Sequence, residues 1–377
     1  MLGNQHAVQT LSDATSARTL LLALRSAERW QAEMLSTSAT AGKDKLSQPI
    51  FWDRTRLIGL VDTFFNKTYI FLETMSKIIS FGEALIDLTP EGRTASGAPI
   101  FSANPGGAPA NLSVMAAKLG ADAAFMGAVG ADAFGGQLKN ALAAGGVDTS
   151  FMVEKPANTG LAIVQLDDKG ERSFSFYRSP GADELYSSDD IIEEKLKNVS
   201  VFHYGTASFT SGSCRSVIAK AIEIVKKNGG LTSFDPNYRD FMWQGKDNEI
   251  KQIIRDNIAE ADLLKLSDNE ADMIYGGHGE AEIAKSPADF TVFTLGEEGC
   301  LYKYKNTIGR VAAIKVTPAD TTGAGDAFWG ATLAQYVAGF EDIEQMLRRS
   351  NIAGALTTTK KGAISAFPSK EEIESYL

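Results

Sequence analysis

The chain has 377 residues, with 37 Lys and Arg against 47 Asp and Glu, and a formal net charge of −10 at pH 7. A composition of 44% hydrophobic and 22% charged residues can build a sizeable core, which excludes a wholly disordered chain. The acidic balance argues against a general nucleic-acid or membrane-surface binder, because both need basic faces. Two cysteines exclude a disulfide framework, and three histidines leave little scope for a His-rich metal centre.

The first 74 residues differ from the rest of the chain. They carry a net charge of +1, which leaves −11 on residues 75–377. Apolar residues at helical spacing predict one amphipathic helix over residues 12–35, and a second apolar patch, residues 57–72, is too interrupted to span a membrane. We therefore predict an N-terminal extension over residues 1–74 and a catalytic domain over residues 75–377. The expected location is cytoplasmic, or a plastid or other organelle if the extension is a transit segment, although its seven acidic residues oppose that interpretation.

From Met75 onwards, apolar strand-like runs alternate with helical stretches. This alternation predicts a mainly parallel sheet covered by helices on both faces. Two β-rich runs, residues 161–166 and 172–177, flank an Asp-Asp-Lys-Gly turn and predict a hairpin that forms a small separate sheet. The other predicted strands are residues 77–88 (interrupted by Gly82), 123–129, 199–203, 231–234, 262–266 and 290–295. The predicted helices are residues 111–119, 135–144, 214–227, 249–258 and 327–337.

The strongest chemical signal is Asp-Thr-Thr-Gly-Ala-Gly-Asp at residues 320–326, directly before a predicted helix. Gly323, Ala324 and Gly325 at a helix start leave backbone N–H groups free to approach an anion. The carboxylate of Asp326 would repel a bound phosphate, but it suits a group that takes the proton of an attacking hydroxyl. The alternative interpretation is a strand-turn-helix connection in which Asp326 only satisfies the helix terminus.

A second glycine loop, Asn-Pro-Gly-Gly-Ala-Pro-Ala-Asn at residues 104–111, opens another predicted helix. Gly106 and Gly107 allow the backbone to come close to a ligand or to bend. Asn111 offers both a donor and an acceptor, which suits sugar hydroxyls. Such Pro/Gly loops are common, so the joint presence of the two motifs indicates more than either alone.

Together the two motifs resemble the two signatures of the PfkB (ribokinase-like) carbohydrate kinase family, over residues 77–377. Within the family the resemblance is greatest to fructokinases, through segments that include residues 82–87, 176–178 and 235–239. The resemblance implies a three-layer α/β/α domain with a mainly parallel sheet. It also implies a small β lid formed by the hairpin over about 158–180, with a contribution from about 88–104.

The implied activity is ATP-dependent phosphorylation of a sugar hydroxyl, with fructose converted to fructose 6-phosphate. Kinases for 2-keto-3-deoxygluconate, another sugar or a nucleoside stay open, as does a non-catalytic scaffold. The expected partners are the sugar, ATP and a second copy of the chain that pairs through the lid. There is no Walker Gly-x-x-x-x-Gly-Lys-[ST] sequence, so no P-loop lysine serves the phosphates.

The resemblance also implies a role for each matching residue. Asp326 matches the general base, and Gly323, Ala324 and Gly325 match the anion hole. Glu270 matches a residue that holds the Mg²⁺ of ATP through water, while Asp320 and Thr322 resemble a monovalent-cation site that would take K⁺. The residues implied on the sugar side are Asp87, Gly106, Gly107, Asn111 and Arg178. The residues implied on the nucleotide side are Ser267, Glu270, Thr294, Gly296, Gly299 and Asn351.

Two of these assignments have plainer alternatives. Asp87 could be an ordinary carboxylate at a strand end, and Arg178 could be a solvated charge at the rim of the site. Ser267 stands where the family has Asn, which affects the expected arrangement of water around the magnesium ion.

Overall fold

The computed structural model describes residues 77–166, 172–178 and 180–377. The predicted extension over residues 1–74 lies outside the described residues. From Lys77 onwards the described chain belongs to one compact unit. No helix among the described residues is both long and apolar enough to cross a membrane.

The centre of this unit is a nine-stranded sheet with the order β13-β12-β11-β10-β9-β8-β1-β4-β5. The strands from β5 to β11 are parallel to one another, and β12 and β13 continue the sheet in antiparallel pairing. Most of the parallel strands are short apolar runs, because both of their faces are buried. The bounds are β1 Lys77–Phe81, β4 Asp122–Gly130, β5 Asp148–Lys155, β8 Val199–Tyr204, β9 Leu231–Phe234, β10 Leu263–Ser267, β11 Phe290–Thr294, β12 Cys300–Tyr304 and β13 Thr307–Val311.

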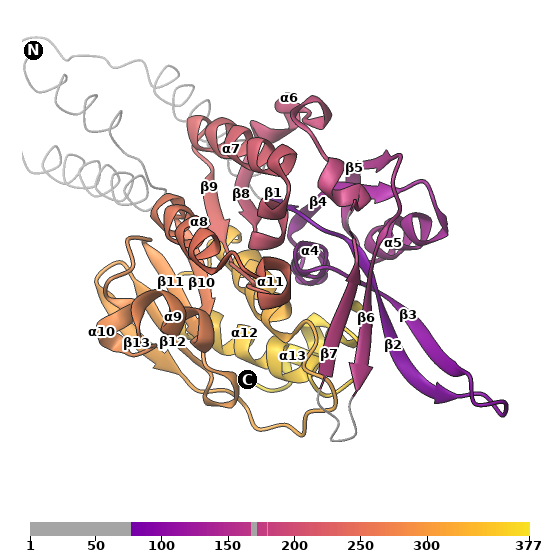
Figure 1. Ribbon diagram of the computed structural model, residues 1–377. Helices are drawn as coiled ribbons and strands as arrows, with labels where there is room; N and C mark the ends of the chain where they lie inside the picture. The colour runs from indigo at the N-terminus through magenta and orange to yellow at the C-terminus, as the bar shows by residue number, and fades with distance from the viewer. Residues whose placement is uncertain (1–76, 167–171, 179) are drawn as a thin grey trace, which may run out of the picture. The chain divides into compact units, whose positions relative to one another are not determined.

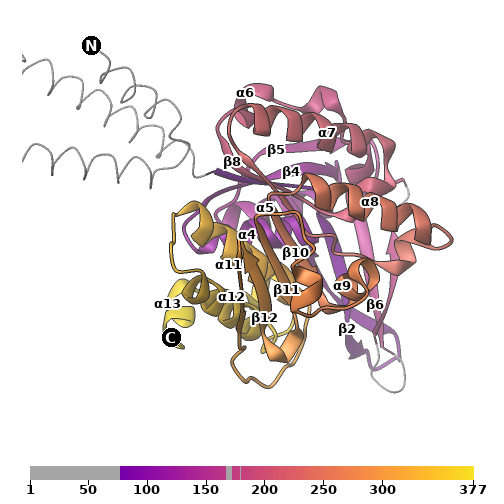
Figure 2. The same ribbon diagram turned by 90° about the vertical axis from the view of Figure 1, so that its left-hand side faces the viewer.

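Helices cover both faces of this sheet (Figures 1 and 2). Successive side chains of a strand point to opposite faces. Ile79 therefore packs in the cluster that contains α7 and α8, and Ile78 packs in the cluster that contains α4, α11 and α12. These layers confirm the predicted three-layer α/β/α arrangement. The helices are α4 Ala108–Lys118, α5 Ala133–Ala144, α6 Glu193–Leu196, α7 Gly212–Lys227, α8 Asp247–Glu260, α9 Asp268–Tyr275, α10 Glu280–Ile283, α11 Ala324–Val337, α12 Ile343–Thr357 and α13 Lys370–Glu374.

A four-stranded sheet with the order β3-β2-β6-β7 projects from the main body (Figure 1). It joins the predicted hairpin, β6 Gly160–Leu166 and β7 Arg172–Tyr177, to β2 Leu85–Arg93 and β3 Pro99–Gly106. The small sheet thus has the two predicted contributions. The tip of the hairpin lies outside the described residues.

The predicted single strand over residues 77–88 is wrong, because the chain changes sheets in the middle of it. β1 ends at Phe81 in the main sheet, and β2 begins at Leu85 in the small one. Between them Gly82 has φ +151°, and a Cβ there would lie 2.7 Å from Pro109 Cγ. Only glycine fits this bend. The continuous apolar run in the sequence therefore forms two separate strands in the structure.

Candidate active site

Two cavities open beside the carboxyl ends of the parallel strands, where open α/β sheets bind ligands. The first, of about 470 Å³, is lined by the residues that follow β1, β8, β9 and β10 and by the starts of α4 and α11. The second, of about 820 Å³, lies beside β11, α11 and α12. Thr321 and Gly325 line both cavities. The two cavities therefore meet at the N-terminus of α11.

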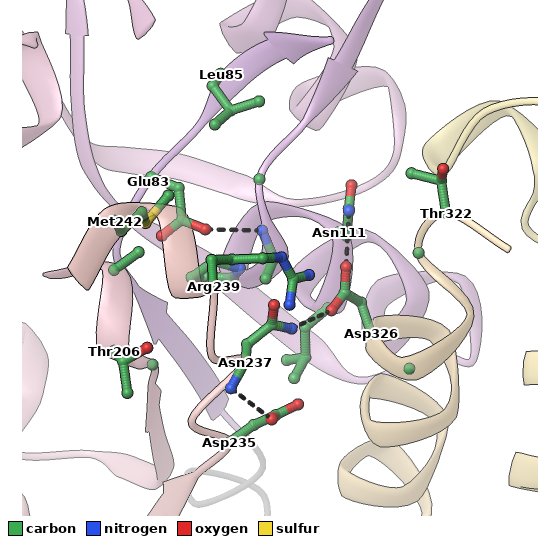
Figure 3. Close-up of a pocket in the computed structure, with 18 of the residues that line it drawn as sticks. Glu83, Leu85, Asn111, Thr206, Asp235, Asn237, Arg239, Met242, Thr322 and Asp326 are labelled. Atoms are coloured by element: carbon green, nitrogen blue, oxygen red, sulfur yellow. Dashed lines mark hydrogen bonds between the residues drawn. The ribbon is translucent and has the colours of Figure 1, made fainter. Parts of the chain in front are cut away.

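Asp326 stands at this junction, in the first turn of α11, with 9% of its surface exposed. Asn111 Nδ2 donates a hydrogen bond of 2.8 Å to one carboxylate oxygen, and Asn237 Nδ2 donates one of 3.0 Å to the other (Figure 3). Burial raises the pKa of Asp326, and the hydrogen bond from Asn111 opposes that rise. A buried carboxylate in this state is suited to accept a proton from a hydroxyl placed in the first cavity.

Asn237 belongs to a tight turn after β9. The carboxylate of Asp235 accepts the Asn237 backbone N–H at 3.0 Å, and Asn237 has φ +45°, a left-handed conformation that Asn tolerates better than most residues. This turn directs the Asn237 amide towards Asp326. The Asp-Pro-Asn signal at residues 235–237 was visible in the sequence, but it did not reveal which group the amide contacts.

The start of α11 has the geometry expected for an anion site. Gly323 caps the helix with φ +77°, and a Cβ there would lie 2.8 Å from Ala363 Cβ. The first N–H groups of a helix have no acceptor within it and carry its positive dipole end. Gly323 lines the first cavity and Ala324 lines the second. An anion held by these amides would lie between the two compartments.

Asp320 holds the loop before α11 in place. Its carboxylate accepts the backbone N–H of Thr322 at 2.8 Å and that of Gly362 at 3.1 Å. With Thr322 and Asp87 it lines a small cavity beside the first one. The two residues expected at a monovalent-cation site are therefore neighbours.

On the side expected to bind the sugar, the glycine pair lets the backbone pass close to the Asp87 carboxylate and to the main chain of Glu83. A Cβ on Gly106 would collide with the Asp87 carboxylate, and one on Gly107, which has φ +106°, would collide with the Glu83 carbonyl. Asp87, Gly107 and Asn111 line the first cavity. Gly106 does not line it, but its backbone packs against the Asp87 carboxylate. The Glu83 carboxylate accepts the Ala108 N–H at 3.1 Å and fixes the start of α4 (Figure 3).

Asp87 is expected to make the stability of the protein depend on pH. Burial raises its pKa to about 7, helped by the nearby charges of Asp326 and Asp320. The folded pKa exceeds the ordinary Asp value of about 4, so ionisation costs stability as the pH rises from about 4 to about 7. Asp87→Asn should therefore melt a few degrees above the parent at pH 8 and level with it near pH 4. Thermal melts across this range test the point, and an equal difference at both pH values would contradict it.

Ser267 and Glu270 line the first cavity, whereas the sequence resemblance assigns them to the nucleotide side. Glu270 accepts the backbone N–H of Ser267 and that of Tyr238, both at 2.7 Å. Its carboxylate is therefore fixed at the end of β10. Within the described ranges no group of three or more His, Cys, Asp or Glu could hold a metal ion. A Mg²⁺ ion near Glu270 would thus complete its shell with water and phosphate oxygens, as this ion commonly does.

Lys265 was missed by the sequence reasoning. It lines the first cavity, and its Nζ lies 2.8 Å from Asp235 Oδ2. Burial lowers the pKa of Lys265, but the carboxylates of Asp235 and Glu270 outweigh burial and raise it overall. A lysine inside an otherwise apolar strand was the available signal, because buried lysines are rare unless paired.

The other four residues expected on the nucleotide side lie together in the second cavity. Thr294, Gly296, Gly299 and Asn351 all line it. Asn351 Nδ2 donates to the Val311 carbonyl at 3.0 Å, so this amide holds the end of β13.

Arg178 departs from its expected place. Among the described residues that line the two cavities it is absent, and its guanidinium is buried in an ion pair with Asp183. It also donates to the Ala207 carbonyl at 3.2 Å. These contacts place Arg178 at the base of the lid as a buried charge, neither against the cavity nor at a solvated rim.

Aromatic stacking joins the small sheet to the body of the domain. Phe176 of β7 and Phe241, which follows the β9 turn, stack with ring centroids 4.4 Å apart, and both rings line the first cavity. The small sheet thus forms one wall of this cavity, as expected for a lid.

The three-layer fold, the lid and two cavities that meet at a helix N-terminus are typical of a class of enzymes with two adjoining sites for small ligands. The chain belongs to the pfkB family of carbohydrate kinases, whose family model matches residues 75–370. It is therefore a carbohydrate kinase, as the two glycine motifs indicated.

Individual relatives support this assignment. A protein named probable fructokinase-4 from Arabidopsis thaliana is 41% identical over 316 residues, which cover 80% of this chain and 97% of the relative. A fructokinase from Xylella fastidiosa with bound ATP has a TM-score of 0.72 at 31% identity, over 80% of this chain and 97% of that one. A fructokinase from Vibrio cholerae O395 with fructose, ADP and calcium has a TM-score of 0.72 at 33% identity, over 81% of this chain and 99% of that one.

Proposed function

We propose that the enzyme transfers the γ-phosphoryl group of ATP to the 6-hydroxyl of D-fructose. The observation that carries the proposal is the buried carboxylate of Asp326, held by two amides where the two cavities meet. Asp326 takes the proton of the 6-hydroxyl, the hydroxyl oxygen attacks the γ-phosphorus, and the bond to ADP breaks. The amides of Gly323, Ala324 and Gly325 stabilise the negative charge on the transferring group. The fructokinase relatives support fructose as the acceptor.

The first cavity would hold the sugar and the second the nucleotide. Asp87 and Gly107 face the sugar in this arrangement, and Asn351 lies on the nucleotide side. Glu270 would hold Mg²⁺ through water, and the ion would neutralise charge on the ATP phosphates. Hard oxygen donors and the calcium-bound relative support a divalent cation. We also propose that K⁺ binds at Asp320 and Thr322, whose oxygens suit this ion. If so, kinase activity should increase on addition of KCl but not of NaCl.

A panel of acceptors tests the function directly. Release of ADP is measured with purified full-length protein and fructose, 2-keto-3-deoxygluconate, ribose or adenosine. Fructose should give the highest kcat/KM. A higher value for another acceptor would keep the kinase and replace the substrate, and no ADP release with any acceptor would favour the scaffold alternative.

We further propose that residues 75–377 carry the activity without the extension. The family match over residues 75–370 and the location of both cavities within the described chain support this partition. A variant that begins at Met75 should retain kcat and KM within about twofold of the full chain. Loss of active protein on truncation would show that residues 1–74 are needed. The compartment stays cytoplasmic in this proposal, and a fluorescent fusion of the full chain would reveal an organelle instead.

A homodimer through the lid is the expected assembly. The small sheet exposes large apolar side chains, with 43% of Ile100, 41% of Phe101 and 63% of Tyr177 accessible. Covering them in a pair of lids would remove apolar surface from water. Sedimentation of the parent and of Phe101→Ser should give a dimer and a weakened dimer. A monomer for the parent would reject this assembly.

A further inference from the structure

Lys265 is a buried positive charge inside the first cavity. Its neighbours Leu264 and Leu266 point into the core, whereas the Lys265 side chain, 6% exposed, reaches the cavity. Among the described residues, Asp235 is the one carboxylate within ion-pair distance of its Nζ, at 2.8 Å. Burying a charged pair is costly and rarely adds stability. The position therefore calls for a function beyond folding.

The ammonium lies beside the anion site. A Cβ built on Gly325 would lie 3.3 Å from Lys265 Nζ, and Gly325 lines both cavities. An ammonium has three N–H donors, and the Asp235 carboxylate uses one side of it. The other donors are available to oxygens at the junction of the cavities.

The charge around the junction also calls for a cation. Asp326, Asp235, Glu270 and Asp87 all line the first cavity, so it is strongly acidic. A phosphoryl group in transfer spreads negative charge over its three equatorial oxygens, which these carboxylates would repel. The chain has no P-loop lysine. Helix amides carry only partial charges. Arg239 also lines this cavity, but Lys265 is the cation whose ammonium lies against Gly325 at the junction, so it adds a full positive charge there.

We infer that Lys265 is a second catalytic residue, whose ammonium binds the equatorial oxygens of the transferring phosphoryl group. The inference rests on the proposed kinase function. Asp235 is a positioning residue for both halves of the site. Its Oδ2 holds the Lys265 ammonium. Its Oδ1 accepts the backbone N–H of Asn237, whose side-chain amide binds Asp326 (Figure 3). One carboxylate thus sets the distance between the proposed base and the cation.

The test compares Lys265→Met, Asp235→Asn and the double variant, with Lys303→Met as control. Lys303 is also partly buried and donates to backbone carbonyls, but it lies outside both cavities. Lys265→Met should lower kcat by ~10²-fold or more, as for loss of one donor to a developing oxyanion, with the sugar KM little changed. The affinity for ADP with aluminium fluoride, which mimics the transferring group, should fall by a similar factor. Lys303→Met should leave both values near the parent.

The double variant distinguishes catalysis from charge balance. It removes both buried charges and should fold well, as thermal melts will show. We expect it to remain as slow as Lys265→Met and as weak for ADP–aluminium fluoride. Recovery of parent kcat in the double variant, or unchanged affinity for the mimic in Lys265→Met, would overturn the role. A parent that phosphorylates no acceptor would instead reject the kinase function, and the binding measurement would still test Lys265.

Discussion

Asp326→Asn should lower kcat by about 10²- to 10⁴-fold, the range that a general base contributes, and leave the protein at least as stable as the parent. The amide has the shape of the carboxylate but cannot accept the hydroxyl proton. Because burial raises the pKa of Asp326, its ionised form costs folding free energy at neutral pH, and the neutral amide removes that cost. Asn111 Oδ1 is buried without a partner among the described residues. If the Asn111 amide rotates, this oxygen can accept a hydrogen bond from the side-chain N–H that the substitution introduces.

Turnover, sugar affinity and melting temperature check this expectation together. Asp247→Asn, which changes an exposed Asp in α8, serves as the matched control and should keep full turnover. Near-parent turnover in Asp326→Asn would remove Asp326 from the role of base. Lost sugar binding or a lowered melting temperature would instead mean that its carboxylate is needed to build the site.

Asn111→Leu should displace the pH profile of the reaction. The hydrogen bond from Asn111 lowers the pKa of Asp326, so its removal raises that pKa further. A base works only when ionised, and therefore the acidic limb of kcat/KM should move to higher pH. At pH 7 we expect a loss of about tenfold to a hundredfold, in keeping with one hydrogen bond to a charged group. Part of the loss should be recovered at alkaline pH.

Asn257→Leu is the control for this substitution. Asn257 lies in α8 and donates to the Ile253 carbonyl, away from both cavities, so its replacement should leave the pH profile in place. A uniform loss of activity by Asn111→Leu at all pH values, with a raised sugar KM, would mean that Asn111 acts on the sugar alone.

Local sequence patterns were sufficient for most of the central fold. The apolar run over residues 231–234 matches β9 in full, and the helical spacing after residue 213 extends to the observed end of α7 at Lys227. These elements bury one face or two, so their hydrophobic period is strong. β12 and β13 were not predicted. They are short strands, β13 at the edge of the sheet and β12 next to it, and both mix polar with apolar residues, which leaves no clear period.

Within the site, too, some residues could be identified from local sequence patterns and others could not. The two glycine motifs, through their joint resemblance to the family, indicated Asp326, Gly323 and Asn111, because backbone approach and helix termini need particular residues in consecutive positions. The placement of Ser267 with Glu270 on the first cavity could not be read from their spacing, since it depends on which cavity the end of β10 faces.

The charges of the chain also show which properties follow from sequence and which need the fold. The sequence by itself determined that the protein is acidic, that an α/β kinase domain follows residue 74, and which loop carries the proposed base. Only the tertiary structure decided how that charge is arranged. It brings Asn237 and Lys265 to Asp326 from strands far apart in the chain, and it buries Arg178 against Asp183. Ion pairs and clamps of this kind depend on distance in space, and sequence separation carries no information about it.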